Sequence, residues 1–119
     1  MGKILIATVP MHLTRWQKET LPSRDALRSA LMGEGLTVSE WIDAPGTVYP
    51  VQAHEHIEVR WVLRGELRVG LPEHGEEFIL GPGDRVDLPP NTPYWIDVNG
   101  NAPVVYLSAT KNNHMNHKK

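Results

Sequence analysis

From Leu36 onward the sequence is a series of short runs with high β-propensity, and each run ends at residues that favour tight turns. The runs are 36–42, 47–51, 58–64, 67–71, 76–80, 85–88, 94–98 and 104–109. The segments between them are rich in Gly, Pro, Asn and Asp, as at residues 43–46, 81–84 and 99–101. Many short strands between regular turns are typical of an all-β barrel or sandwich, so we predict a barrel over residues 36–110.

Residues 1–35 precede this barrel and carry the main predicted helix. Ser23 is a suitable N-cap and Asp25 falls in the first turn. The following apolar stripe consists of Ala26, Leu27, Ala30 and Leu31 and ends at Gly33 and Gly35. Residues 4–9 are also β-prone and stop at Pro10, which indicates a strand or an arm added to a sheet edge.

The length of 119 residues and the 40% hydrophobic content suit one compact core. We therefore expect a single domain in which the strand and helix of residues 1–35 pack on the barrel. Residues 111–119 form a polar tail that we expect to fray.

Composition excludes several classes of function. The chain has no cysteine, so it has no disulfides, thiolate metal sites or cysteine nucleophile, and any metal must bind nitrogen and oxygen. The net charge of -2, from 12 basic and 14 acidic residues, produces no basic field for nucleic acid or a membrane surface. No apolar run approaches the roughly 20 residues of a membrane span, and residues 3–10 are too short for a signal peptide. These features predict a cytoplasmic protein.

One cluster of side chains can carry chemistry. Gln52, His54, His56 and Glu58 fall at every second position, so in an extended strand they would share one face. In a closed barrel that face is the lumen, where four polar side chains need a metal, a hydrogen-bond network or water. The alternative is that some of them lie in the loop before the strand and face solvent.

The spacing around this cluster resembles the first motif of the cupin superfamily. That motif runs Gly, five residues, His, one residue, His, three or four residues, Glu, six residues, Gly. The matching positions here are Gly46, Gln52, His54, Glu58 and Gly65. Only the first ligand differs, with Gln in place of His.

The second cupin motif is also recognisable. It runs Gly, five residues, Pro, one residue, Gly, two residues, His, three residues, Asn. The matching positions are Gly83, Pro89, Asn91, Tyr94 and Val98. Residues 61–67 and 80–84 are likewise similar to the strand and turn that link the two motifs, so the resemblance covers about residues 46–109.

The backbone conformations that these residue types favour agree with the two motifs. We expect positive φ at Gly65, Gly81 and Gly83, and Asn91 tolerates the left-handed region better than most residues. The prolines of residues 89–93 would stiffen the loop that presents Tyr94 to the lumen.

The resemblance implies an all-β double-stranded β-helix, a cupin or jelly-roll-like barrel with a short N-terminal helix. Cupins with the full motif hold a divalent ion with three His and one Glu. The same positions here imply a site made of Gln52, His54, Glu58 and Tyr94 for a divalent ion such as Fe, Mn, Ni or Zn. A phenol ionises near pH ~10 unless it is perturbed, so a neutral Tyr94 is a weak ligand and metal affinity should fall.

Two alternatives to this ligand set remain open. His56 could substitute as a ligand, which would give a facial set of His54, His56 and Glu58. Alternatively, the site has lost its metal, and the four side chains satisfy each other through hydrogen bonds and lumen water.

Two functional hypotheses follow. The first is a metal-dependent enzyme on a small molecule, dioxygenase-like or isomerase-like, with Arg60 and Trp95 in the substrate pocket. The second is a non-catalytic cupin with a degenerate metal site that binds a small ligand in the same lumen. Small cupins of this kind are usually homodimers, which implies a homodimer here, with no nucleic-acid or membrane partner.

Overall fold

The computed structural model describes residues 11–111, which contain nine strands and one helix. The elements are β1 (His12–Thr14), α1 (Arg24–Gly33), β2 (Thr37–Asp43), β3 (Val48–Gln52), β4 (Glu58–Arg64), β5 (Leu67–Leu71), β6 (Glu76–Leu80), β7 (Arg85–Leu88), β8 (Tyr94–Val98) and β9 (Val104–Thr110). In this part of the chain, no helix has the length and apolar character that crossing a bilayer would require.

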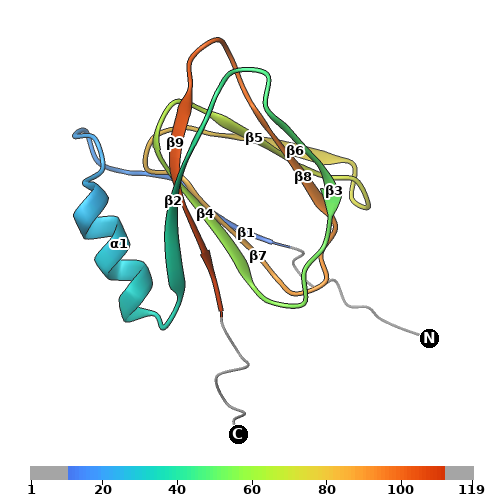
Figure 1. Ribbon diagram of the computed structural model, residues 1–119, viewed down its shortest axis with the longest axis horizontal. Coiled ribbons are helices and arrows are strands. Elements are labelled where there is room, and N and C mark those ends of the chain that lie inside the picture. The colour runs from blue at the N-terminus through green and yellow to red at the C-terminus, as the bar shows by residue number, and fades with distance from the viewer. Residues whose placement is uncertain (1–10, 112–119) are drawn as a thin grey trace, which may run out of the picture.

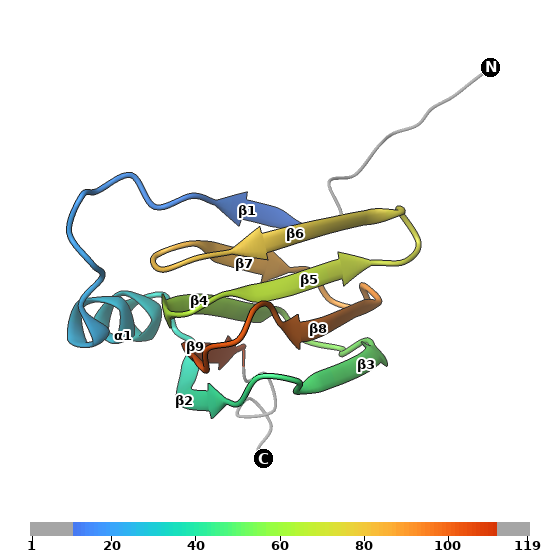
Figure 2. The ribbon, with the colours of Figure 1, turned by 90° about the horizontal axis from the view of Figure 1, so that it is seen from above.

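The strands form two sheets that close around a common interior (Figure 1). The first sheet has the order β1-β7-β4-β9-β2 and the second the order β3-β8-β5-β6, with antiparallel pairing throughout. Figure 2 shows β2 and β3 along one side of the molecule and β1 and β6 along the other. This arrangement is the predicted all-β double-stranded β-helix.

Strand alternation places apolar side chains between the two sheets. In β8, for example, Tyr94, Ile96 and Val98 are buried, whereas Trp95 and Asp97 between them are partly exposed. A second core lies on the outer side of the first sheet, where Leu27 and Leu31 of α1 pack with Val59 of β4. The molecule is therefore layered as sheet, core, sheet and helix.

The predicted element boundaries agree closely with the structure. Strands β4 to β8 have the expected bounds, β2 and β3 are displaced by one residue, and β9 extends one residue further. Ser23 caps α1 as expected, because its Oγ accepts a hydrogen bond from the Ala26 N–H at 3.3 Å. Strand β1 was not predicted, since its three residues are too short to show alternation. The strand expected at residues 4–9 lies outside the described residues.

The turn residues follow the expected conformations with one exception. Gly65, Gly83 and Asn91 have φ values of 76°, 89° and 62°. The prediction of positive φ is wrong for Gly81, whose N–H instead donates to the Asp84 carboxylate at 2.9 Å. At Gly83 a side chain would also collide with the ring of Trp16, so this turn requires glycine for two reasons.

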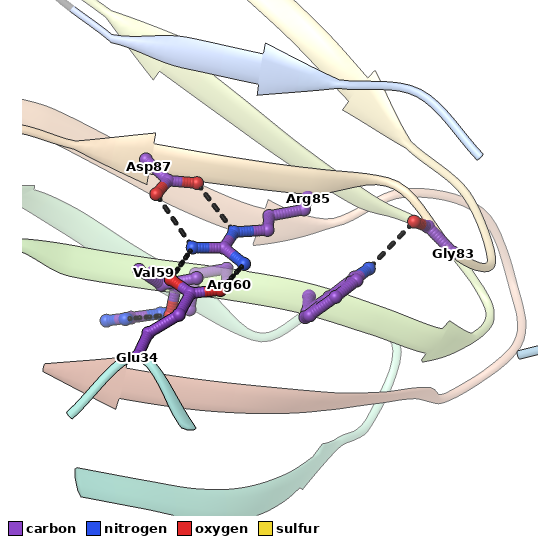
Figure 3. A network of polar contacts seen from close by, with 7 residues as sticks. Glu34, Val59, Arg60, Gly83, Arg85 and Asp87 are labelled. Atoms are coloured by element: carbon purple, nitrogen blue, oxygen red, sulfur yellow. Dashed lines mark hydrogen bonds and ion pairs between the residues drawn. The ribbon is translucent and has the colours of Figure 1, made fainter. Parts of the chain in front are cut away.

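Arg85 of β7 joins the helix to the barrel (Figure 3). Its guanidinium forms two hydrogen bonds to Glu34 at 2.8 and 2.7 Å and two to Asp87 at 2.8 and 2.9 Å. The guanidinium also lies 5.0 Å from the ring centroid of Trp61. Because Glu34 is the C-cap residue of α1, this network fixes the end of the helix against the outer face of the first sheet.

Candidate functional site

The four positions of the sequence motifs lie around Tyr94. Gln52 is the last residue of β3 and Tyr94 the first of β8, and the two are paired in register. The rings of His54 and Tyr94 are 6.0 Å apart between centroids. Glu58 is the first residue of β4, and Arg60 links it to Tyr94 by donating hydrogen bonds to both side chains. The structure therefore brings Gln52, His54, Glu58 and Tyr94 together.

The backbone between these positions is not one continuous strand. Strand β3 ends at Gln52 and β4 begins at Glu58, and the residues between them form a bend. Gln52, His54, His56 and Glu58 therefore do not share one extended strand, and His54 and His56 lie in the loop before β4, as the alternative interpretation allowed. The His54 carbonyl accepts a backbone hydrogen bond from Asn91 at 2.6 Å, which holds the bend against the loop before β8. Both histidines of the bend are partly buried.

The His54 side chain is hydrogen-bonded to the side chain of Gln52. Its Nε2 lies 2.9 Å from the Gln52 Oε1. An amide oxygen can only accept a hydrogen bond, so Nε2 carries the proton in this contact. A protonated ring nitrogen has no lone pair for a metal, and this nitrogen is therefore not a ligand in the observed arrangement.

Arg60 occupies the centre of the cluster. One terminal nitrogen donates to the Glu58 carboxylate and to the Val59 carbonyl, both at 3.0 Å, and the other donates to the Tyr94 hydroxyl at 3.4 Å. The Arg60 and Glu58 side chains are only 12% and 14% exposed. The site thus contains a nearly buried ion pair.

The Tyr94 phenol is neutral at ordinary pH. Burial raises the pKa of Tyr94, the positive charge of Arg60 opposes this increase, and the negative charge of Glu58 adds to it. The net pKa of Tyr94 stays above its usual value, so its hydroxyl acts as a neutral hydrogen-bonding group.

The side chains around Tyr94 offer few free donors to a divalent ion. The described residues contain no group of three His, Cys, Asp or Glu side chains that could hold a metal. Of the expected ligands, His54 is hydrogen-bonded to Gln52 and Glu58 is paired with a guanidinium. A fixed positive charge on the carboxylate disfavours a second cation. The residues in this arrangement therefore do not fit a divalent ion.

The cluster borders a cavity of about 170 Å³ between the two sheets. Its lining residues are Trp41, Tyr49, Gln52, Arg60, Ile96, Tyr106 and Ser108. Gln52 and Arg60 are the predicted site residues among them. Trp41 borders the cavity while remaining 46% exposed.

Sequence reasoning missed the tyrosines of this cavity. Tyr49 and Tyr106 come from different sheets, and neither belongs to a motif. The available signal was the alternation along β9, where Val104 and Tyr106 are buried in the interior core and Ser108 borders the cavity on the same face. The buried Asp43 at the end of β2 was also missed, because it resembles an ordinary turn residue.

Trp95 lies elsewhere. It belongs to the face of β8 opposite Tyr94 and Ile96, packs over Gly70, and has the Arg68 guanidinium 5.5 Å from its ring centroid. Trp95 is not among the residues that line the Arg60 cavity.

A larger hollow of about 240 Å³ lies outside the barrel, between the segment before α1 and the first sheet. Its charged residues include Arg24 and Glu40, which pair with each other at 2.7 Å. The cavity at Arg60 is smaller, but it combines enclosing aromatic walls with a nearly buried cation, so it is the better candidate site.

Comparison with known proteins agrees with the architecture. A family model described as Cupin domain matches residues 39–110. A cupin 2 domain-containing protein from Halorhodospira halophila is 20% identical, with a TM-score of 0.66 over 87% of this chain and 76% of that chain. No curated protein sequence matches this chain.

Two larger enzymes share the barrel. DMSP lyase DddQ from Ruegeria pomeroyi is 25% identical, with a TM-score of 0.59 over 66% of this chain and 39% of that chain. Oxalate decarboxylase from Bacillus subtilis, which has Mn(II) centres, is 20% identical, with a TM-score of 0.58 over 67% of this chain and 22% of that chain. The chain thus spans less than half the length of either enzyme.

Proposed function

Since the chain belongs to the cupin domain family, we propose that it uses the barrel as a binding site for a small organic anion, which Arg60 recognises. This is the second of the two functional hypotheses, a ligand-binding cupin with a degenerate metal site. It makes Arg60 the principal binding residue.

The observation that carries this proposal is the position of Arg60 on the cavity wall. A guanidinium has five N–H donors, and the three hydrogen bonds of Arg60 to described residues account for three of them. Its planar fork matches a carboxylate, and its charge acts strongly where solvent screening is reduced. Glu58 holds the guanidinium in place and neutralises its charge in the free protein.

Propionate is a suitable probe for this site, because it is a small carboxylate without other polar groups. We expect the Arg60→Met variant to bind propionate at least about tenfold more weakly than the wild type, since a hydrogen-bonded charge is lost. Arg68→Met is a matched control, because Arg68 pairs with Asp97 on the outer face of the second sheet. Heteronuclear NMR titration measures both affinities. Equal binding by wild type and Arg60→Met would exclude Arg60 as the anion site.

The second candidate is a metal-dependent enzyme with His54 and Glu58 as principal ligands. It is supported by the proximity of both side chains to Tyr94 and by the Mn(II) centres of oxalate decarboxylase, which shares the fold. Gln52 and Tyr94 would complete the shell or contact substrate, with His56 as a substitute ligand. The candidate ions remain Fe, Mn, Ni and Zn. Binding would require Arg60 to release Glu58 and the His54 Nε2 to lose its proton.

Elemental analysis of protein purified without added metal distinguishes the two candidates. The metal-dependent enzyme predicts one equivalent of a divalent ion, which the His54→Ala variant loses. The anion-binding protein predicts substoichiometric metal in both proteins and propionate binding that persists in EDTA. A stoichiometric metal that depends on His54 would overturn the first proposal.

A further inference from the structure

A buried carboxylate shares the barrel interior with Arg60. Asp43 is 8% exposed and lies at the end of β2. Its carboxylate accepts a hydrogen bond from the Tyr106 hydroxyl at 2.6 Å and from the Tyr49 hydroxyl at 3.0 Å. The tyrosines reach it from β3 and β9, and thus from both sheets.

This carboxylate has no cationic partner among the ion pairs of residues 11–111. Burial of an ionised carboxylate is unfavourable, and the two phenol donors offset this cost without supplying a positive charge. A positively polarised group from a ligand would stabilise the cluster further. The cluster is therefore suited to a hydrogen-bond donor.

The two tyrosines connect this charge to the cavity. Both line the cavity that Arg60 lines, and both point their hydroxyl protons at Asp43. A phenol oxygen that donates to a carboxylate keeps its lone pairs and becomes a better acceptor, because adjacent hydrogen bonds polarise one another. The cavity wall thus combines a strong donor, Arg60, with acceptors at Tyr49 and Tyr106.

We propose that the ligand of this barrel is a short, bifunctional acid, with its carboxylate on Arg60 and a hydroxyl or ammonium group on the phenol oxygens of Tyr49 and Tyr106. This inference rests on the proposed anion site and names its ligand class. The cavity of about 170 Å³ has room for an acid of a few carbon atoms.

Three probes of nearly equal size test the inference. Propionate has only the carboxylate, 3-hydroxypropionate adds a terminal hydroxyl, and β-alanine adds a terminal ammonium. We expect the wild-type protein to bind at least one of the latter two about three- to tenfold more tightly than propionate, as one additional hydrogen bond allows. NMR titration or calorimetry measures all three affinities.

The Tyr49→Phe variant should reduce this preference, measured as the ratio of the affinity for each donor-bearing acid to the affinity for propionate in the same variant. It removes one phenol oxygen and leaves Asp43 its shorter bond to Tyr106. The Asp43→Asn variant distinguishes the two donors, because loss of the charge should weaken β-alanine more than 3-hydroxypropionate. Thermal unfolding of each variant verifies that it folds.

The outcomes separate this inference from the proposed function. If all three acids bind equally and their binding depends on Arg60, the anion site stands and the bifunctional ligand is rejected. If the preference for the donor-bearing acids is as large in Tyr49→Phe as in the wild type, the tyrosine cluster does not recognise the donor. If no acid binds, both proposals are overturned.

Discussion

At the scale of single residues, the site depends on how Arg60 is shared between Glu58 and the cavity. The guanidinium is nearly buried and has one carboxylate partner at 3.0 Å. A ligand carboxylate therefore competes with Glu58 for the same cation. Loss of the Glu58 carboxylate should therefore strengthen anion binding at Arg60. In the metal-dependent candidate, the same loss would weaken metal binding, because Glu58 is a ligand there.

We expect Glu58→Gln to raise the affinity for propionate and to lower the stability of the free protein. Removal of one partner leaves Arg60 without its counter-ion, which should cost about 1–3 kcal/mol of unfolding free energy. Chemical denaturation with and without propionate measures both effects. Glu40→Gln is a control, because Glu40 pairs with Arg24 outside the barrel. Loss of propionate binding in Glu58→Gln would contradict competition at Arg60.

The tyrosines make the stability of the protein decrease at alkaline pH. The chain has three tyrosines, and the pKa of each is raised, chiefly by burial. A raised pKa means that the folded state favours the protonated phenol. The resulting stability is complete below the unfolded value of about 10 and is lost as pH rises through the folded values.

We therefore expect phenolate absorbance to appear at a higher pH than in a model peptide and to coincide with unfolding. Ultraviolet titration and circular dichroism, recorded on the same samples between pH 8 and pH 13, compare the two transitions. A tyrosine that ionises with an ordinary pKa while the protein remains folded would contradict this expectation.

At the scale of elements, α1 is held by its apolar face and by one arginine. Leu27 and Leu31 pack on the first sheet, and Arg85 binds the C-cap residue Glu34. The hydrogen bond from Arg85 lowers the pKa of Glu34. The stability from this contact is present above the unfolded pKa of Glu34 and is lost as pH falls through its lower folded pKa.

The Arg85→Met variant should lower the unfolding free energy by about 1–3 kcal/mol, because hydrogen bonds to Glu34 and Asp87 are lost together. Arg28→Met on the exposed face of α1 is a control that should change stability little. Urea unfolding at pH 7 compares the two variants. Equal stability of both variants would show that this network does not anchor the helix.

At the scale of the whole molecule, two sheet edges lie on one side of the barrel (Figure 2). Strands β2 and β3 end their respective sheets, and both carry exposed apolar side chains. These residues are Trp41, Ile42, Val48 and Val51. Unpaired strand edges with apolar side chains favour association with another chain.

We accordingly expect a homodimer that uses this side. Light scattering coupled to size exclusion should give the mass of two chains at micromolar concentration. Ile42→Lys together with Val51→Lys should shift the protein to a monomer, whereas Ile79→Lys, on β6 at the other side, should not. A monomer in the wild type would contradict this prediction.

Strands β2 to β9, their boundaries and the capped helix could be predicted from sequence, because turn residues, alternation and N-caps act over a few neighbouring residues. Motif spacing also identified the four positions around Tyr94 correctly as neighbours. The alternation from Gln52 to Glu58 does not place these side chains on one face, because a period of two requires an extended backbone and this segment bends. The residue types left both a strand and a loop open for this segment, and only the structure decided between them.

Only the tertiary structure decided what the site contains. Arg60 pairs with Glu58 and reaches Tyr94, while Tyr49 and Tyr106 meet at Asp43 from two sheets. Residues such as Asp43 and Tyr106 are 63 positions apart in the chain. Their contact depends on the register of β2 against β9 and on the closure of the two sheets, and no local pattern in the sequence encodes either.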